Sequence, residues 1–156
     1  MFSGWFARKP YKVEVIGIMA GVRFEEGSRT MVLDSAIIRA KTAIFLDKMR
    51  WLPPHDSVPI DDDEKERIKS IIAKEMHHYL PIWVPPGCDA NEVVRAAEAK
   101  AEEVRPTAEA AFREGRFDEA ARLYESVGSC LSFRELGRLK RAKRRAAKAK
   151  KGERSS

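Results

Sequence analysis

Residues 51–65 read WLPPHDSVPIDDDEK, and their order marks the end of one kind of structure and the start of another. Two adjacent prolines cannot donate backbone hydrogen bonds to a sheet and hold the residue before them extended, so we expect a strand to end at Trp51. Asp61, with Glu64 three residues later, is the pattern of a helix N-cap, and the acidic side chains between them suit the positive end of the helix dipole. The stretch therefore predicts a strand, a rigid connection and a helix.

The residues before this stretch alternate between apolar and polar positions over 12–52, and this period of two predicts strands. A Glu-Gly-Ser turn at 26–28 joins predicted strands at 22–25 and 30–33 into a hairpin. A further strand is predicted over 42–51. We therefore expect an antiparallel meander.

The residues after the stretch follow the period of an amphipathic helix that ends before Pro81. Its apolar stripe, which would cover one face of the sheet, consists of Ile68, Ile71, Ile72, Met76 and Tyr79. Residues 82–84 add a short edge strand. We predict an α+β domain over residues 12–86, with a small antiparallel sheet of four or five strands covered by one helix, preceded by an aromatic arm at 1–11.

The composition shifts after residue 86 to alanine, glutamate and arginine, which are strong helix formers. We expect one helix to end near Val104, a second to begin at Pro106 and be closed by Gly115, and a third to begin at Phe117. Small and aromatic residues in this segment have a spacing that resembles one tetratricopeptide-type hairpin: Ala111, Gly115, Phe117, Ala120, Tyr124 and Val127. Because a solenoid needs about three such units, we expect only a helical hairpin, over 87–131.

The net charge of +6 is unevenly distributed along the chain. Residues 1–85 carry a formal charge of +1, residues 86–132 carry −4, and residues 133–156 carry +9. The excess positive charge thus belongs to a basic tail, 132–156, that we expect to be helical or disordered. The remainder would offer a mixed or mildly acidic surface.

The basic tail is a candidate nucleic-acid-binding segment because clustered lysine and arginine gain affinity for phosphate backbones by counterion release. It lacks the interleaved aromatic residues that stack on single-stranded bases. An acidic membrane surface would attract the same charges, and a solubilising disordered terminus is a further alternative. The candidate residues are Arg138, Lys140, Arg141, Lys143, Arg144, Arg145, Lys148, Lys150 and Lys151.

Several classes of protein do not fit the sequence. No apolar run approaches the roughly 20 residues of a membrane span, and the first residues lack the pattern of a secretory signal. Cys88 and Cys130 are far apart and belong to no metal-binding pattern, so we expect a reducing compartment, the cytoplasm or an organellar matrix. His77 and His78 are adjacent on the predicted helix and diverge by about 100°, so we expect no metal there. Without a phosphate loop or a nucleophile motif, we expect no catalytic residues, no cofactor and no enzyme activity.

Two quoted stretches carry a resemblance to a known family. GVRFEEGSRTMVLDSAII and WLPPHDSVPIDDDEKERIKSII lie within residues 17–84, which resemble the group called immunity protein 74 of bacterial polymorphic toxin systems. The matching positions are Gly27, Trp51, Pro53, Pro54, Asp56, Pro59, Ile60, Glu64, Lys65, Ile68 and Ile72. The resemblance implies a small α+β domain that masks a toxin protein. The helical hairpin and the basic tail depart from this pattern.

The segment from Trp51 to Glu64 is therefore a candidate partner-binding face, on which rigid aromatic and proline groups lose little entropy and acidic groups attract a basic toxin. Trp51 could instead plug the end of the sheet, and helix capping accounts for Asp61 and Glu64. The candidate residues are Trp51, His55, Asp56, Asp61, Asp62, Asp63 and Glu64. We predict a non-enzymatic protein-binding module, with an RNA- or ribosome-associated structural protein, anchored by the basic tail, as the alternative.

Overall fold

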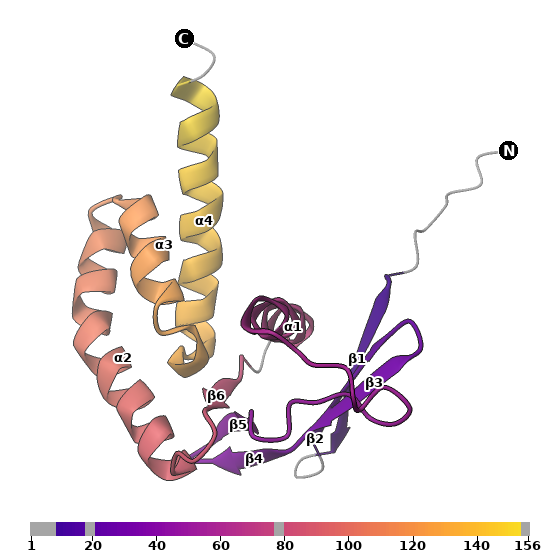
Figure 1. The fold of residues 1–156 in the computed structure, drawn as a ribbon. Coiled ribbons are helices and arrows are strands. Elements are labelled where there is room, and N and C mark those ends of the chain that lie inside the picture. The colour runs from indigo at the N-terminus through magenta and orange to yellow at the C-terminus, as the bar shows by residue number, and fades with distance from the viewer. Residues whose placement is uncertain (1–8, 18–20, 77–79, 154–156) are drawn as a thin grey trace, which may run out of the picture. The chain divides into compact units, whose positions relative to one another are not determined.

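The structure of the protein is a computed structural model that describes residues 9–17, 21–76 and 80–153. The chain forms two compact units, Met1–Ala90 and Asn91–Ser156, which are described in turn. The first unit contains all the strands among the described residues, and the second is helical (Figure 1). The predicted α+β class is confirmed.

The first unit differs from the prediction in its sheets, because the strands form two three-stranded sheets in place of one meander. One sheet has the antiparallel order β1 (Tyr11–Gly17), β2 (Gly21–Glu26), β3 (Arg29–Leu33). The other has the order β4 (Ser35–Ile38), β5 (Lys41–Phe45), β6 (Ile82–Val84), and β6 runs parallel to β5. The parallel pair is possible because a helix crosses over between β5 and β6 and returns the chain in the same direction.

The predicted hairpin at 22–33 is confirmed, with Glu26 paired to Arg29 across a two-residue turn. Gly27 has φ +60° at the first turn position, where a type II′ turn favours glycine. The turn between β4 and β5 is different, because Arg39 and Ala40 both adopt positive φ, 50° and 59°. That conformation strains side chains with a Cβ atom.

The predicted end of the strand over 42–51 is wrong, because β5 ends at Phe45. The chain then turns, with the Met49 N–H donating to the Leu46 carbonyl at 3.1 Å, so the two prolines do not end the strand. Beyond the turn, the Leu52 N–H donates to the Thr30 carbonyl at 2.7 Å. This bond holds the irregular segment that contains Trp51 against the β2–β3 hairpin.

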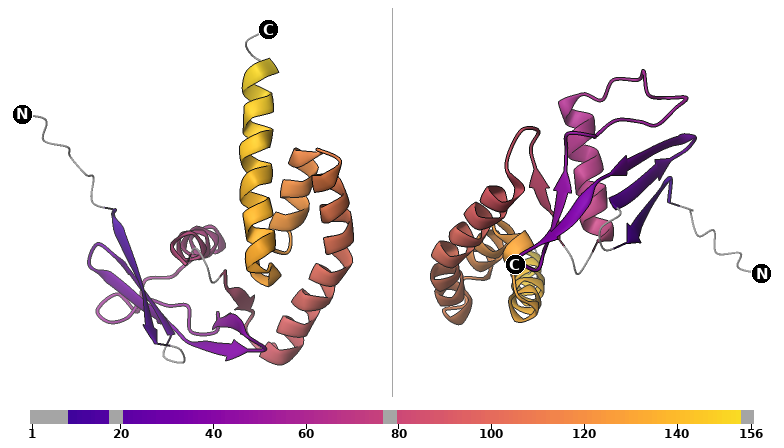
Figure 2. Two further views of the ribbon diagram at one scale, coloured as in Figure 1. Left: turned by 180° about the vertical axis from the view of Figure 1, so that it is seen from behind. Right: turned by 90° about the horizontal axis from the view of Figure 1, so that it is seen from below.

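Helix α1 (Asp62–Glu75) begins as predicted, with the Glu64 N–H donating to the Asp61 carboxylate at 2.8 Å. The helix ends at Glu75, and the predicted positions Tyr79, His77 and His78 lie outside the described residues. Its apolar face packs on the strands (Figure 2). The buried core of this unit comprises Val22, Phe24, Met31, Leu33, Ile44, Met49, Trp51, Ile68, Ile72 and Met76.

The second unit corrects the predicted break near Val104, because α2 (Ala90–Arg113) is one continuous helix with Pro106 inside it. Proline removes one backbone hydrogen bond and disfavours helix in the residue before it. That residue, Arg105, is held by its side chain, which donates to the Glu135 carboxylate at 2.8 Å and to the Cys130 carbonyl at 2.9 Å. Tertiary contacts therefore outweigh the local preference.

The remaining helices are α3 (Phe117–Glu125), the short 3₁₀ helix η1 (Gly128–Cys130) and α4 (Phe133–Glu153). The predicted turn between α2 and α3 forms at Gly115, which has φ +78°, and Phe112 packs edge-on to Phe117 at 5.7 Å between ring centroids. A capping box forms at the start of α4, since Ser132 and Glu135 exchange hydrogen bonds at 2.7 and 3.3 Å.

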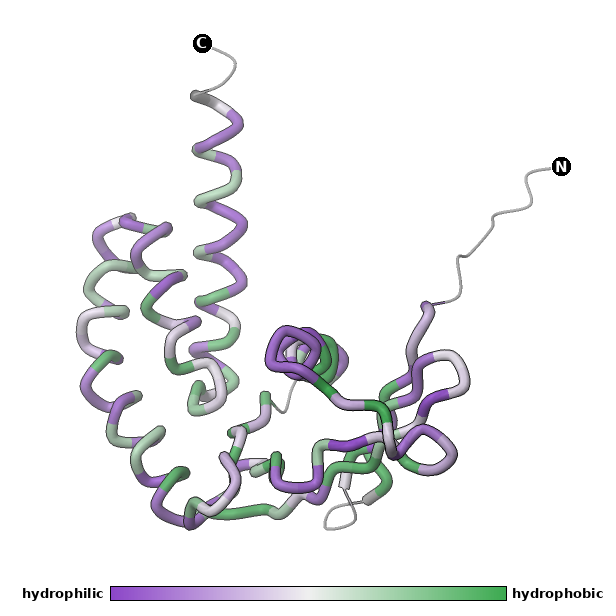
Figure 3. Tube along the Cα trace, viewed as in Figure 1, coloured by the Kyte–Doolittle hydropathy of each residue, from purple (hydrophilic) through white to green (hydrophobic). Residues whose placement is uncertain are grey.

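The basic tail is helical over its described residues and packs along α3 (Figure 2). Ala142 and Ala146 are buried on its inner side, although the helix is hydrophilic along most of its length (Figure 3). Residues 133–153 thus belong to the same compact unit as the helices before them.

Candidate binding surfaces

An ion network lies over Trp51 in the first unit and joins the β2–β3 turn to α1. The Arg67 guanidinium donates to both Glu26 oxygens, at 2.9 and 2.8 Å, and to both Glu64 oxygens, at 3.0 and 2.9 Å. Arg29 donates to Glu26 at 2.9 Å and lies 4.4 Å from the centroid of the Trp51 ring. The network contains two positive and two negative groups, so it is neutral and holds the start of α1 against the hairpin.

The structure removes Trp51 from the exposed candidate face. Its side chain is 1% exposed and lies within the core, 6.1 Å from the centroid of Phe24. The plug interpretation therefore describes Trp51, and a partner cannot reach its indole. His55 is half-buried, with its Nε2 3.3 Å from the Ser28 hydroxyl.

The predicted acidic cluster is divided among several tasks. Hydrogen bonds from Arg67 hold the pKa of the Glu64 carboxyl below its usual value of 4.5, against the opposing effect of burial, so Glu64 is part of the internal network. Asp61 caps α1, and exposed Asp62 accepts from Lys65 at 3.0 Å. Asp56 and Asp63 are also exposed, and neither has an ion pair within the described part of the chain.

The connection at residues 52–60, called the 52–60 loop below, carries the exposed apolar side chains of this segment. Leu52 and Val58 are 39% and 40% exposed, beside exposed prolines and Asp56. Backbone bonds of 3.0 Å from the His55 N–H to the Leu52 carbonyl and from the Val58 N–H to the His55 carbonyl hold its shape. The loop therefore presents an ordered apolar surface next to acidic groups.

The predicted nucleic-acid-binding residues on α4 fall into two groups. Three of them are paired with acidic side chains of the helices beside α4: Arg138 with Glu109, Lys143 with Glu125, and Lys150 with Asp118 at 3.1 Å. Hydrogen bonding to Glu109 raises the pKa of Arg138, so this guanidinium stays charged. These residues fasten α4 within its unit.

The second group lies on the outer side of α4. Arg141, Arg144, Arg145 and Lys148, called the basic face below, are exposed and together line a surface hollow of about 590 Å³. Their spacings of three and four residues place them on one side of a helix. Arg145 also lies over the Phe117 ring at 5.4 Å, and Arg141, Arg144 and Lys148 have no acidic partner among the residues that the structure describes.

Lys140 and Lys151 are exposed on the same helix. At about 100° per residue, both fall on the side of α4 opposite buried Ala142 and Ala146. They extend the positive potential of the basic face along the helix.

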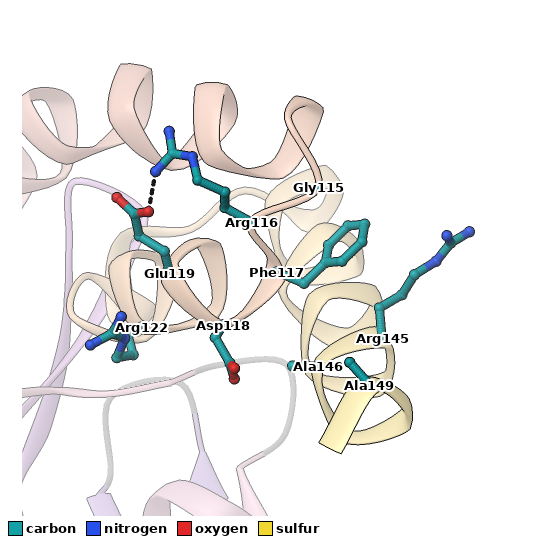
Figure 4. Close-up of a pocket in the computed structure, with 9 residues that line it drawn as sticks. All are labelled: Gly115, Arg116, Phe117, Asp118, Glu119, Arg122, Arg145, Ala146 and Ala149. Carbon is teal, nitrogen blue, oxygen red and sulfur yellow. Dashed lines mark hydrogen bonds and ion pairs between the residues drawn. The ribbon is translucent and has the colours of Figure 1, made fainter. Parts of the chain in front are cut away.

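A second hollow, of about 320 Å³, lies between the start of α3 and the middle of α4 (Figure 4). Its lining carries both signs of charge, and Arg116 pairs with Glu114 and Glu119. Figure 4 shows Arg145 directed away from that pair, toward the outer side of α4. Because its charges largely compensate one another, this hollow is a weaker site for a polyanion than the basic face.

Sequence reasoning missed the groups that complete these sites. Glu26, Arg29 and Arg67 come from separate elements, and only the Glu64–Arg67 spacing of three residues is a local signal. Arg105 and Glu109 reach α4 across about thirty residues of chain. No local pattern predicts such pairs.

No protein-family model, no curated protein and no solved structure matches the chain. The immunity-like assignment and the tetratricopeptide-type resemblance therefore remain predictions from the sequence.

The described residues offer neither a metal site nor a membrane-spanning helix. Over residues 9–17, 21–76 and 80–153, no group of three or more histidine, cysteine, aspartate or glutamate side chains is arranged to hold a metal ion. No helix in those ranges is both long enough and apolar enough to cross a membrane.

Proposed function

We propose that the chain is a non-enzymatic binding protein that uses the basic face of α4 to hold the phosphate backbone of RNA. The observation that carries this proposal is that the basic residues of α4 fall into a paired group and an outward-facing group. Lys143 and Lys150 pair with α3, whereas Arg141, Arg144 and Lys148 face outward and have no acidic partner within residues 9–17, 21–76 and 80–153. Charges that no neighbouring acid neutralises are available for phosphates.

The geometry of the basic face suits the phosphate backbone of a nucleic acid better than a nucleic-acid base or a lipid. Positions 141 and 148 lie about 10 Å apart along a helix with a rise of 1.5 Å per residue, which spans about three phosphates of a strand. Between them the outer side of α4 carries no aromatic residue for stacking and no large apolar residue for insertion into a membrane. The expected binding is therefore tight at low salt and weakly dependent on sequence.

Fluorescence anisotropy with a labelled RNA hairpin of about 16 base pairs tests this proposal. We expect the variant R141Q/R144Q/R145Q/K148Q to bind at least tenfold more weakly than the natural chain at low salt. The slope of log K against log salt should also fall by about 3, because each phosphate contact contributes about 0.9.

The matched control is K143Q/K150Q, which removes two positive charges that are already paired. We expect this control to lose much less affinity per charge removed. An unchanged affinity in the quadruple variant, or equal losses per charge in the two variants, would contradict the proposal.

A second candidate function is protein docking through the 52–60 loop, as the immunity-like resemblance implies. Exposed Leu52 and Val58 beside Asp56 favour a partner with an apolar patch edged by basic groups. Cross-linked partners would be compared after nuclease treatment for the natural chain, for L52S/V58S and for the quadruple variant of the basic face. Docking predicts a protein that is lost only with L52S/V58S, and recovery of the same protein by all three chains would exclude this surface.

A further inference from the structure

Strand β1 is the outermost strand of its sheet, because the order is β1, β2, β3. Among the described residues no strand pairs with its outer edge. An open edge exposes backbone donors and acceptors that another strand can use.

The hairpin turn determines which β1 residues have their backbone groups at that edge. Glu26 and Arg29 flank a two-residue turn, so they exchange both of their backbone hydrogen bonds, and this pattern alternates along the strands. Glu25 and Arg23 therefore direct their backbone groups toward β1, where their partners are Lys12 and Glu14.

It follows that the backbone groups of the other β1 residues, at positions 11, 13 and 15, are directed to the open edge. The side chains near this edge are unusually apolar for an exposed strand. Val15 is 57% exposed and Ile16 is 44% exposed. The edge thus combines backbone groups that no described strand pairs with and exposed apolar side chains, which favours the addition of a strand.

We propose that the strand that covers this edge is β1 of a second copy of the chain, paired antiparallel about Val13. In this register Val13 faces the partner's Val13, and Tyr11 faces the partner's Val15. All of these positions have their backbone groups at the edge, so each forms a hydrogen-bonded pair. Exposed Val15 gains an aromatic neighbour.

The charges on the other side of the strand complement each other only in this register. Centring the pair on Val13 places Lys12 opposite the partner's Glu14, and Glu14 opposite the partner's Lys12. Centring it on residue 12 or 14 would place like charges opposite each other. The backbone groups of positions 11, 13 and 15 could pair with one another in those registers as well, so the charges select the register centred on Val13.

The complementary register continues a pattern already present within one chain. Lys12 lies opposite Glu25 and Glu14 lies opposite Arg23 across β1 and β2, and Arg23 and Glu25 are 3.9 Å apart. Two joined sheets would carry rows of alternating charge through both copies. Charged residues on an edge usually discourage pairing, but this arrangement is self-complementary.

Sedimentation velocity over a concentration series to several hundred micromolar tests the proposal, because one added strand pair is a small interface. We expect a reversible dimer for the natural chain. K12E, with two glutamates facing two glutamates, and E14K, with two lysines facing two lysines, should each dimerise at least tenfold more weakly. An equimolar mixture of the two variants should form a heterodimer, because their charges complement each other.

The control is K48E, which breaks the exposed Lys48–Asp34 ion pair of the same unit without touching β1. We expect K48E to dimerise like the natural chain. A natural chain that stays monomeric, or a K12E chain that dimerises normally, would overturn the proposal.

Because charge reversal also affects the pairing of β1 with β2, a second measurement uses the natural sequence alone. Isotope-filtered NMR of mixed labelled and unlabelled chains should show intermolecular contacts from Tyr11 to Val15. Contacts that come only from other surfaces would contradict this register.

Discussion

The cores of the two units are built from different materials. The first unit buries large side chains, among them Trp51, Phe24 and Leu33, in one cluster. The second buries mainly alanines, including Ala101, Ala108, Ala111, Ala120, Ala121, Ala142 and Ala146, with Tyr124 as its largest buried side chain. Because hydrophobic stabilisation scales with buried apolar area, each alanine contributes little.

The second unit compensates with charged contacts between its helices. Glu135 is buried, caps α4 and accepts from Arg105 of α2, while Arg138, Lys143 and Lys150 pair with acidic residues of α2 and α3. The stability of the first unit therefore depends mainly on the packing of large side chains, whereas that of the second unit depends more on charged groups. Basic residues of α4 that are not used in these pairs form the basic face.

The units can be followed separately in one sample. The sequence has no tryptophan after residue 83, and Trp51 and Trp83 belong to the described part of the first unit, so tryptophan fluorescence reports the unfolding of that unit. Most of the helical residues belong to the second unit, so far-UV circular dichroism is weighted toward that unit.

The largest expected effect is the loss of the buried indole. Trp51→Ala should lower the free energy of unfolding of the first unit by about 3–5 kcal/mol, because it leaves a cavity in the core. Urea denaturation followed by the fluorescence of the remaining tryptophans measures the change. Leu52→Ala, at an exposed neighbour, should cost less than about 1 kcal/mol, and comparable losses in both variants would contradict a packed Trp51.

The next effect concerns the second unit. Glu135→Ala removes the α4 capping box and leaves Arg105 without its carboxylate, and should cost about 2 kcal/mol in urea denaturation followed by circular dichroism. Glu125→Ala breaks the exposed pair with Lys143 and should cost less than about 0.5 kcal/mol. Equal effects would show that burial of Glu135 does not matter.

Acid should weaken the second unit through the same residue. Burial raises the pKa of Glu135, but hydrogen bonds from the Ser132 hydroxyl and backbone N–H and the charge of Arg105 outweigh it, so the pKa lies below 4.5. A depressed pKa in the folded state stabilises the protein above pH 4.5, and this contribution is lost as the pH falls below that value. Urea midpoints from circular dichroism between pH 7 and pH 3 should fall for the natural chain and fall less for Glu135→Gln; parallel curves would contradict this role.

The smallest expected effect concerns the turn between β4 and β5 in the first unit. Arg39 and Ala40 adopt positive φ in the β4–β5 turn, where Asn-Gly is favoured. R39N/A40G should therefore stabilise the first unit by about 0.5–1 kcal/mol, measured by tryptophan fluorescence in urea. The matched change G27A places a Cβ at the positive φ of the β2–β3 turn and should destabilise the same unit by a similar amount.

The sequence predicted turns and helix starts well, because these depend on hydrogen bonds and backbone conformations within a few neighbouring residues. The hairpin around Gly27 and the N-cap at Asp61 both form as predicted. Predictions failed where distant residues intervene. Pro106 lies inside a helix because Glu135 and Cys130 hold its neighbour, and β5 ends at Phe45, before the prolines.

The candidate sites divide in the same way. The positive charge of residues 133–156 is a property of composition, and its location on a helix follows from helix-forming residues. Composition does not reveal which of those charges remain available to a ligand, because Glu125, Asp118 and Glu109 neutralise three of them. Likewise, the aromatic and acidic residues of the 51–65 stretch are visible in the sequence, but burial removes Trp51 from the surface and Arg67 pairs with Glu64.

The sequence by itself determined the α+β class, the alternation of strand and helix, and the concentration of basic residues after residue 132. These properties depend on periodicity, capping and composition, which act over a few neighbouring residues. Only the tertiary structure decided the division into two sheets, the continuity of α2 and the separation of α4 into a paired side and a basic face. The reason is physical: pairing between strands, burial and ion pairing join residues tens of positions apart, and their energies override local preference.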